Sequence, residues 1–141
     1  MLRPIEKADK SQVLALWVCC AKQAHPFLPD DWWEQYLEPI RGNYTPAMDT
    51  VVEERDGQII GFISVAEGRL LGALCVHPAF QGQGIGTALL THMTRRYSKL
   101  RMWVYEQNER AVRFYENRGF SRTGETVNPA TGEKEFILVQ S

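Results

Sequence analysis

The amino-terminal quarter of the chain has apolar residues at helical spacing. They recur every three or four residues, at Val13, Leu14, Leu16, Trp17, Cys20, Ala21 and Ala24. Asp9 followed by Gln12 has the spacing of a capping box, so the helix is predicted to begin at Asp9. Pro26 and Pro29 cannot continue a helix, and the segment that contains them is predicted to end it.

Two short elements flank this helix. Residues 2–5 have the pattern of an opening strand. Asp31 and Glu34 form a second capping-box pattern and predict a short helix through 32–37. Trp32, Trp33 and Tyr36 of that segment line a binding site in one interpretation and only pack on the sheet in the other.

The middle of the chain alternates between apolar runs and turn residues, as strands do. The runs cover 50–55, 58–66 and 69–76. Asp56 and Gly57 join the first two runs and are a strong hairpin signal. Only residues 67–68 separate the second run from the third. The pattern therefore predicts an antiparallel meander of three strands.

Helices and strands alternate in the carboxyl-terminal half. A helix after 81–86 would present one apolar face, made of Ile85, Ala88, Leu89, His92, Met93 and Tyr97. A strand at 100–105 follows. Asn108 can cap the next helix, and Gly119 can end it in the left-handed conformation, with Phe120 folding back onto it. A closing hairpin of strands at 121–127 and 133–140 is predicted after that.

The resulting order is β-α-α-β-β-β-α-β-α-β-β, in one domain that covers 1–141. Hairpins followed by strand–helix–strand units imply an α/β (α+β) fold, with a mixed sheet covered by helices. The connection from 70–76 through the helix to 100–105 is expected to be parallel and right-handed.

Composition and charge narrow the range of functions. The net charge is -1, which provides no general attraction to nucleic acid or to an anionic membrane. The first ten residues are too charged for a signal peptide, and the apolar run 59–66 is too short to cross a bilayer. The three cysteines lack disulfide or zinc spacing. We therefore expect reduced thiols, a cytoplasmic location and no metal.

Three glycines, Gly82, Gly84 and Gly86, stand where a helix is predicted to begin. A helix amino terminus exposes free N–H groups, and glycines let a phosphate approach them closely. Each glycine costs about 1 kcal/mol relative to alanine in a helix, which favours this use over a simple connecting turn. Thr87 and Ala88 follow Gly86, so the Walker pattern is absent. The spacing also differs from the dinucleotide fingerprint.

These residues bring the chain close to a known family. Gln81, Gly84 and Gly86 match Q-x-x-G-x-G, which resembles motif A of the GNAT family of N-acetyltransferases. A second stretch resembles motif B of the same family and matches at Val104, Asn108, Ala111, Phe114, Tyr115, Gly119 and Phe120. The element order is similar as well, and the resemblance is strongest to small bacterial single-domain members.

The resemblance implies acetyl-CoA as acetyl donor and a GNAT fold in which two central parallel strands splay apart at a bulge. The cofactor-binding residues it implies are Leu74, Cys75, Val76, Gln81, Gly82, Gln83, Gly84, Ile85, Gly86, Thr87, Asn108 and Tyr115. Of these, 74–76 would pair with pantetheine and the amides of 81–86 would hold the pyrophosphate. Tyr115 would be the general acid that protonates the departing thiolate.

The acceptor implied by the resemblance is a primary amine, on a protein lysine, an amino terminus or a small molecule. An amine of pKa about 10.4 is almost entirely protonated at pH 7, so a base must take its proton. The strand before the glycines carries no carboxylate. Glu67, His25 and His77, in that order, are the candidate bases. The oligomeric state, monomer or homodimer, stays open.

Two functions without acetyl transfer remain as alternatives at this stage. One is an acyl-CoA-binding module that does not turn over, and the other is a nucleotide-binding regulator. The first would be stabilised by coenzyme A but would release no thiol with any amine, whereas the second would be stabilised by ATP or NADH and not by coenzyme A.

Overall fold

The computed structural model describes residues 1–28, 48–129 and 131–140. Its strands are β1 (Leu2–Pro4), β2 (Met48–Arg55), β3 (Gln58–Ala66), β4 (Leu70–Val76), β5 (Arg101–Tyr105), β6 (Phe120–Val127) and β7 (Lys134–Gln140). Its helices are α1 (Lys10–Ala24), α4 (Ile85–Arg96) and α5 (Glu109–Glu116), with 3-10 turns at Lys7–Asp9 and Pro78–Phe80. The helix expected over 32–37 lies outside the described residues.

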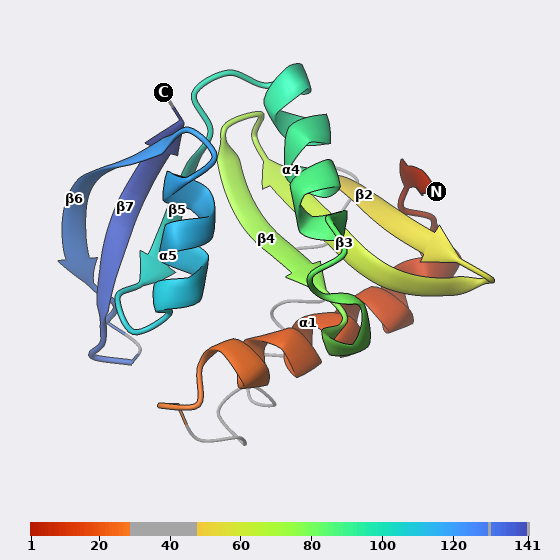
Figure 1. Cartoon of the computed structure of the whole chain (residues 1–141), viewed down its shortest axis with the longest axis horizontal. Helices are drawn as coiled ribbons and strands as arrows, with labels where there is room; N and C mark the ends of the chain where they lie inside the picture. Colours follow the sequence, from red (N-terminus) through yellow and green to blue (C-terminus); the bar gives the residue numbers. More distant parts are fainter. Residues whose placement is uncertain (29–47, 130, 141) are drawn as a thin grey trace.

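The seven strands form one mixed sheet in the order β1-β2-β3-β4-β5-β7-β6 (Figure 1). The main core lies between one face of this sheet and helices α4 and α5. On the opposite face, α1 packs against β3 through a second core that includes Val13, Leu16 and Phe62. We call these the α4–α5 face and the α1 face. The mixed, helix-covered sheet that the sequence predicts is confirmed.

The turn chemistry predicted from the sequence is confirmed at three points. Asp56 and Gly57 both have positive φ, 50° and 78°, as a tight hairpin between β2 and β3 requires. Gly119 follows α5 with a φ of 93°. Phe120 then folds back, and its ring meets that of Tyr115 edge-on at 5.6 Å between centroids.

The predicted capping box at the start of α1 is wrong. Asp9 precedes the helix, but its carboxylate accepts hydrogen bonds from the Arg3 guanidinium at 2.7 and 3.0 Å and from the Glu6 amide at 2.8 Å. Gln12 instead accepts a hydrogen bond from the Ile59 amide at 3.1 Å. A charged partner from β1 competes better for the carboxylate than a helix amide does.

The two central strands separate almost as soon as they meet. Leu70 and Arg101 form the one β4–β5 pair in the described sheet. Along the other edge of β4, Ser64 pairs with Ala73 and Val65 with Leu71, which leaves Gly72 in a bulge. The expected splay at a bulge is therefore confirmed, and the strands diverge toward their carboxyl ends (Figure 1).

Candidate active site

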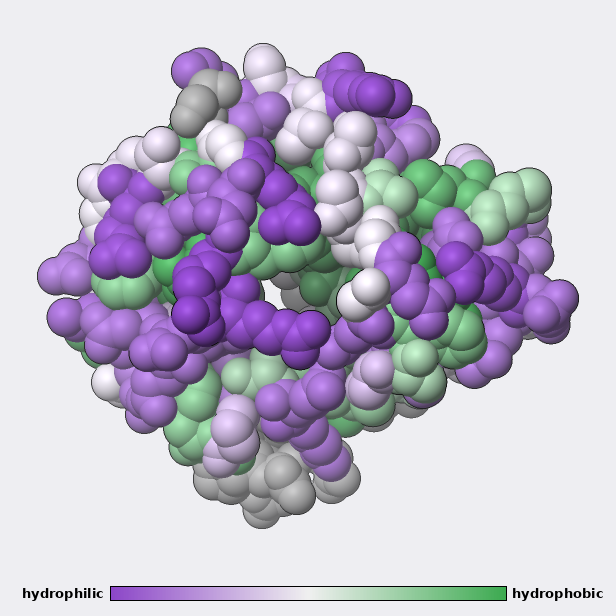
Figure 2. All heavy atoms as spheres, in the orientation of Figure 1, coloured by the Kyte–Doolittle hydropathy of each residue, from purple (hydrophilic) through white to green (hydrophobic). Residues whose placement is uncertain are grey.

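A cavity of about 990 Å³ occupies the space between the diverging strands. Its walls come from α1, β4, the start of α4, β5 and α5, so both faces of the sheet contribute to it. Figure 2 shows the molecule hollowed near its centre, with hydrophilic residues around the opening. A cavity of this kind, open to both faces, can admit two substrates from opposite sides of the sheet.

The glycine-rich turn forms one end of this cavity. Gly82 and Gly84 have φ values of 81° and 83°, and Gly84 is the N-cap of α4 without a side-chain cap. The amides of the first helical turn have no intrahelical acceptors. Gly84, Ile85, Gly86 and Thr87 all line the cavity. This end therefore offers N–H groups and a positive helix end to an anion.

Gln83 is the exception in this segment. It is absent from the cavity lining, and its side chain accepts a hydrogen bond from Arg55 at 3.3 Å. The neighbouring Gln81 does line the cavity, donating to the Val76 carbonyl at 2.9 Å and to Gln23 at 3.0 Å. Gln81 thus connects β4 to α1 beside the glycine turn.

Three arginines that the sequence reasoning missed line the same cavity: Arg110, Arg113 and Arg118. Arg110 donates to Gln81 at 3.2 Å. Arg118 donates to the Thr87 hydroxyl at 3.1 Å. Arg110 and Arg118 therefore place positive charge beside the amino end of α4. The i, i+3 spacing of Arg110 and Arg113 on the predicted helix was the available signal.

The exposed edge of β4 forms the long wall. Leu74, Cys75 and Val76 line the cavity at a point where β5 is no longer paired with them. An unpaired strand edge can accept an extended ligand as an added strand. The Cys75 thiol forms a hydrogen bond with the Cys20 thiol of α1. This hydrogen bond and the burial of the thiol raise the pKa of Cys75 well above its ordinary value.

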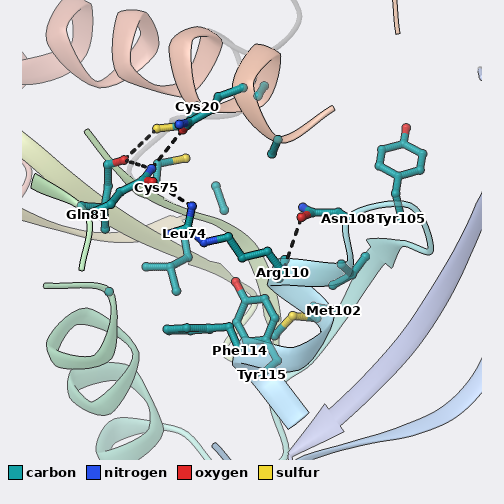
Figure 3. A pocket seen from close by; sticks show the side chains of 18 of the residues that line it. Cys20, Leu74, Cys75, Gln81, Met102, Tyr105, Asn108, Arg110, Phe114 and Tyr115 are labelled. Atoms are coloured by element: carbon teal, nitrogen blue, oxygen red, sulfur yellow. Dashed lines mark hydrogen bonds between the residues drawn. The ribbon is translucent and has the colours of Figure 1, made fainter. Parts of the chain in front are cut away.

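Tyr115 projects from α5 into the space between the two strands (Figure 3). It is 7% exposed, and burial raises its pKa well above the ordinary value, so the phenol is protonated at neutral pH. Its ring packs edge-on against Phe114 at 5.2 Å. The hydroxyl makes no hydrogen bond with any residue in the described part of the chain. A buried polar atom without a protein partner points to a ligand.

Asn108 caps α5 as predicted, accepting a hydrogen bond from the Ala111 amide at 3.3 Å. It also lines the cavity, where β5 gives way to α5. The cap fixes its Oδ1 and leaves its Nδ2 without a partner among the described residues. Asn108 can therefore donate one hydrogen bond into the cavity without losing the cap.

His25 and Tyr105 form an aromatic wall on the α1 face. Their ring centroids lie 5.0 Å apart at an angle of 72°, and both side chains line the cavity. The His25 Nδ1 lies 2.9 Å from the Ala21 carbonyl oxygen. Burial lowers the pKa of His25, so its imidazole is neutral at pH 7.

The two other candidate bases lie away from this cavity. Glu67 is exposed in the turn before β4, 3.5 Å from Arg69, and so lies at the end where β4 and β5 are still paired. His77 accepts a hydrogen bond from the Ala79 amide at 3.0 Å and caps the 3-10 turn. Neither residue belongs to the lining, and the structure brings neither of them to Tyr115.

A carboxylate that the sequence reasoning missed does line the cavity. Glu135 of β7 is half-buried and stands opposite Tyr105 in the β5–β7 ladder. Burial raises the pKa of Glu135, and a hydrogen bond with Asn128 opposes that effect. Pattern alone gave no signal here, because Glu135 is simply a polar position in a closing hairpin.

The comparison with protein families decides what this site belongs to. Residues 7–131 match the acetyltransferase (GNAT) domain family. The chain belongs to the GNAT family. It is an acetyl-CoA-dependent N-acetyltransferase, as the resemblance implied, so the two alternatives without acetyl transfer are set aside.

Individual proteins agree with this assignment. The GNAT chain is 33% identical to the peptidyl-lysine N-acetyltransferase YiaC of Escherichia coli, over 85% of the chain and 82% of YiaC. It is 31% identical to the peptidyl-lysine N-acetyltransferase YjaB of Escherichia coli, over 97% and 92%. The solution structure of apo YjaB has a TM-score of 0.83 at 27% identity, covering 99% of this chain and 96% of that one.

One structural relative shares the fold at lower identity. PaiA N-acetyltransferase from Thermoplasma acidophilum, in complex with coenzyme A, has a TM-score of 0.81 at 18% identity and covers 100% of this chain and 98% of that one. The cavity of this GNAT enzyme fits the acetyl donor chemically. It combines a helix start with free N–H groups, an open strand edge and a buried phenol that has no hydrogen-bond partner among the described residues.

No group of three or more His, Cys, Asp or Glu side chains among the described residues is arranged to hold a metal ion. None of the helices described is both long and apolar enough to cross a membrane.

Proposed function

We propose that this N-acetyltransferase acetylates the side-chain amine of lysine in peptides or proteins. The observation that carries the proposal is the make-up of the cavity on the α1 face. An aromatic wall and one carboxylate, Glu135, border it there. A lysine side chain has a long apolar stem and a cationic tip, and it packs its stem on apolar surface while its charge meets a polar group. The names of YiaC and YjaB support the same acceptor.

For the donor, we propose that the first-turn amides of α4 hold the pyrophosphate. The left-handed Gly84, the uncapped helix start and the nearby arginines support this placement. The pantetheine would pair along 74–76, where β4 has lost its neighbour. The amide of Asn108 would donate to the donor near the thioester.

Tyr115 is proposed as the general acid. The acceptor amine, once neutral, attacks the thioester carbonyl carbon, and the carbon–sulfur bond breaks. The phenol O–H of Tyr115 gives its proton to the leaving thiolate sulfur. The proton that the new amide nitrogen sheds returns to the phenolate, so Tyr115 ends the cycle as it began.

A panel of acceptors tests the proposal, with release of free coenzyme A thiol as the readout. It contains lysine peptides with blocked amino termini, peptides with free amino termini and no lysine, and small polyamines. We expect transfer to the blocked lysine peptides, and mass spectrometry should place the acetyl group on Nζ. Transfer to free amino termini or polyamines alone would contradict the lysine assignment.

The three cysteines of the chain are unpaired, which supports work in a reducing compartment and hence our proposal of a cytoplasmic location. Fractionation of cells that express the tagged chain tests it. Recovery in an oxidising compartment, with a Cys20–Cys75 disulfide, would contradict it.

A further inference from the structure

Two acidic side chains of the described residues line the cavity, Glu109 and Glu135. They belong to different ends of it. Glu109 is exposed in the first turn of α5, on the same helix as Arg110 and Arg113. Glu135 is half-buried on β7, across from Tyr105. The two carboxylates therefore have different partners within reach.

Strand alternation assigns Glu135 to the α1 face. Its neighbour Phe136 packs in the core under α4 and α5, and Leu138 does the same. Successive side chains of a strand point to opposite faces, so Glu135 points away from that core. Tyr105, its partner across the ladder, packs with Ala21 of α1. Glu135 thus shares its face with the aromatic wall and not with the phosphate end.

The Glu135 carboxylate is held by its surroundings. Asn128, just after β6, hydrogen-bonds to it and also donates to the Tyr105 hydroxyl at 3.3 Å. The Asn128 backbone is itself fixed, with its amide 2.9 Å from the Glu133 carbonyl and its carbonyl 2.8 Å from the Gly132 amide. A carboxylate anchored in this way needs little reorganisation when a substrate arrives.

No cation in the described part of the chain pairs with Glu135. Lys134, next to it in sequence, points to the other face, where its ammonium lies 3.6 Å from Glu106 and 3.7 Å from Glu125. In the described aromatic wall on its own face, the ionisable groups are the neutral His25 and the phenol of Tyr105. Arg101 is on the same face of β5 but stands at the other end of that strand, opposite Val139. A half-buried carboxylate without a cation is a ready partner for an ammonium group.

We propose that Glu135 binds the ammonium group of the acceptor and takes its proton, and that Asn128 positions it. The inference rests on the proposed function, since it concerns the amine that attacks the thioester. One N–H bond of the ammonium breaks, its proton moves to the Glu135 carboxylate and later to solvent, and the nitrogen keeps the electron pair that attacks. Burial raises the pKa of Glu135 toward the working pH, which suits a base.

The test compares Glu135→Gln with Glu125→Gln, the same change in the same hairpin on the opposite face. The probes are a blocked lysine tripeptide and its counterpart in which S-aminoethylcysteine, whose amine has a lower pKa, replaces lysine. For Glu135→Gln we expect kcat/KM at pH 7 with the lysine peptide to fall by about 10²- to 10⁴-fold. The loss in kcat/KM should be smaller with the less basic amine. In the variant, the rise of kcat/KM from acid pH, the acid limb of the pH profile, should follow the loss of a proton by the amine itself and no longer by Glu135.

Acetyl-CoA should raise the melting temperature of both variants as it does that of the wild type. Asn128→Ala should shift the acid limb of the profile without removing it, because the carboxylate remains. The inference is overturned if Glu135→Gln keeps kcat/KM within about twofold of Glu125→Gln, if the loss is equal for both amines, or if His25→Asn is the variant that removes the limb. If the wild type transfers acetyl to neither peptide, the proposed function fails first and takes this inference with it.

Discussion

Replacing Tyr115 with phenylalanine should make the protein more stable and far less active. The substitution removes one oxygen and keeps the ring, so the edge-on contacts with Phe114 and Phe120 persist. The hydroxyl that disappears is buried and has no partner among the described residues. Catalysis and stability should therefore change in opposite directions.

The size of each effect follows from the surroundings of this hydroxyl. A buried hydroxyl without a hydrogen bond costs about 1–3 kcal/mol in proteins. Because this one borders a cavity, we take the low end and expect the free energy of unfolding to rise by about 1 kcal/mol. That corresponds to a gain of roughly 3–4 °C in melting temperature for a chain of this length. Loss of a general acid should lower kcat by about 10²-fold or more, or at least about 2.7 kcal/mol.

Tyr97→Phe is the matched control. The Tyr97 hydroxyl donates to the Asp49 carboxylate at 2.7 Å, outside the cavity. Its removal should cost about 1 kcal/mol and leave turnover unchanged. Melting curves without ligand and coenzyme A release with a lysine peptide measure both quantities. The reasoning is refuted if Tyr115→Phe loses as much stability as Tyr97→Phe, or if it keeps the wild-type kcat.

Three further experiments test other parts of the structure. Gly84→Ala, at a φ of 83°, should lower the free energy of unfolding by about 1–2 kcal/mol and remove most of the rise in melting temperature that acetyl-CoA causes. Gly57→Ala, at a φ of 78° in a hairpin, should lower the free energy of unfolding by a similar amount and keep that rise. Asp9→Asn should lower the free energy of unfolding by about 1.5–3 kcal/mol at pH 7. The hydrogen bonds from the Arg3 guanidinium lower the pKa of Asp9, so they stabilise the fold at any pH above the pKa that this carboxyl has in the unfolded chain. The difference in free energy of unfolding between Asp9→Asn and wild type, measured by urea titration, should disappear as the pH falls below 3.8. A difference that stays constant with pH would show that the ionised carboxylate is not what stabilises the fold. Iodoacetamide should modify Cys20 before Cys75, because the pKa of Cys75 is the higher of the two, and acetyl-CoA should slow the reaction. Tandem mass spectrometry, which distinguishes Cys20 from the adjacent exposed Cys19, measures the two rates.

Much of this fold could be predicted from the sequence because short stretches of residues determine its turns and helix ends. The Asp56 and Gly57 turn, the Asn108 cap and the left-handed Gly119 each depend on a few neighbouring residues. The glycine turn before α4 was predictable for the same reason, because glycine is the residue that readily adopts the positive φ that this turn requires. The capping box at Asp9 failed because a distant strand residue, Arg3, competes for the carboxylate.

The base illustrates what local patterns leave out. Glu67 looked suitable because it lies in the hairpin before β4. However, β4 and β5 pair only at Leu70 and Arg101, so the strands are closed at the end where Glu67 lies. Glu135 looked ordinary because its position depends on β7 lying between β5 and β6 in the sheet. That order, set by packing of the whole hairpin, is what brings its carboxylate opposite Tyr105.

The single pair between Leu70 and Arg101 also affects how strongly the protein resists unfolding. Two sub-sheets, one of four strands and one of three, share almost no main-chain hydrogen bonds across the break, and the donor would fill that gap. A ligand present at 100 times its dissociation constant adds about 2.7 kcal/mol of resistance to unfolding. When the donor is scarce, we therefore expect the protein to unfold more readily and to be degraded faster.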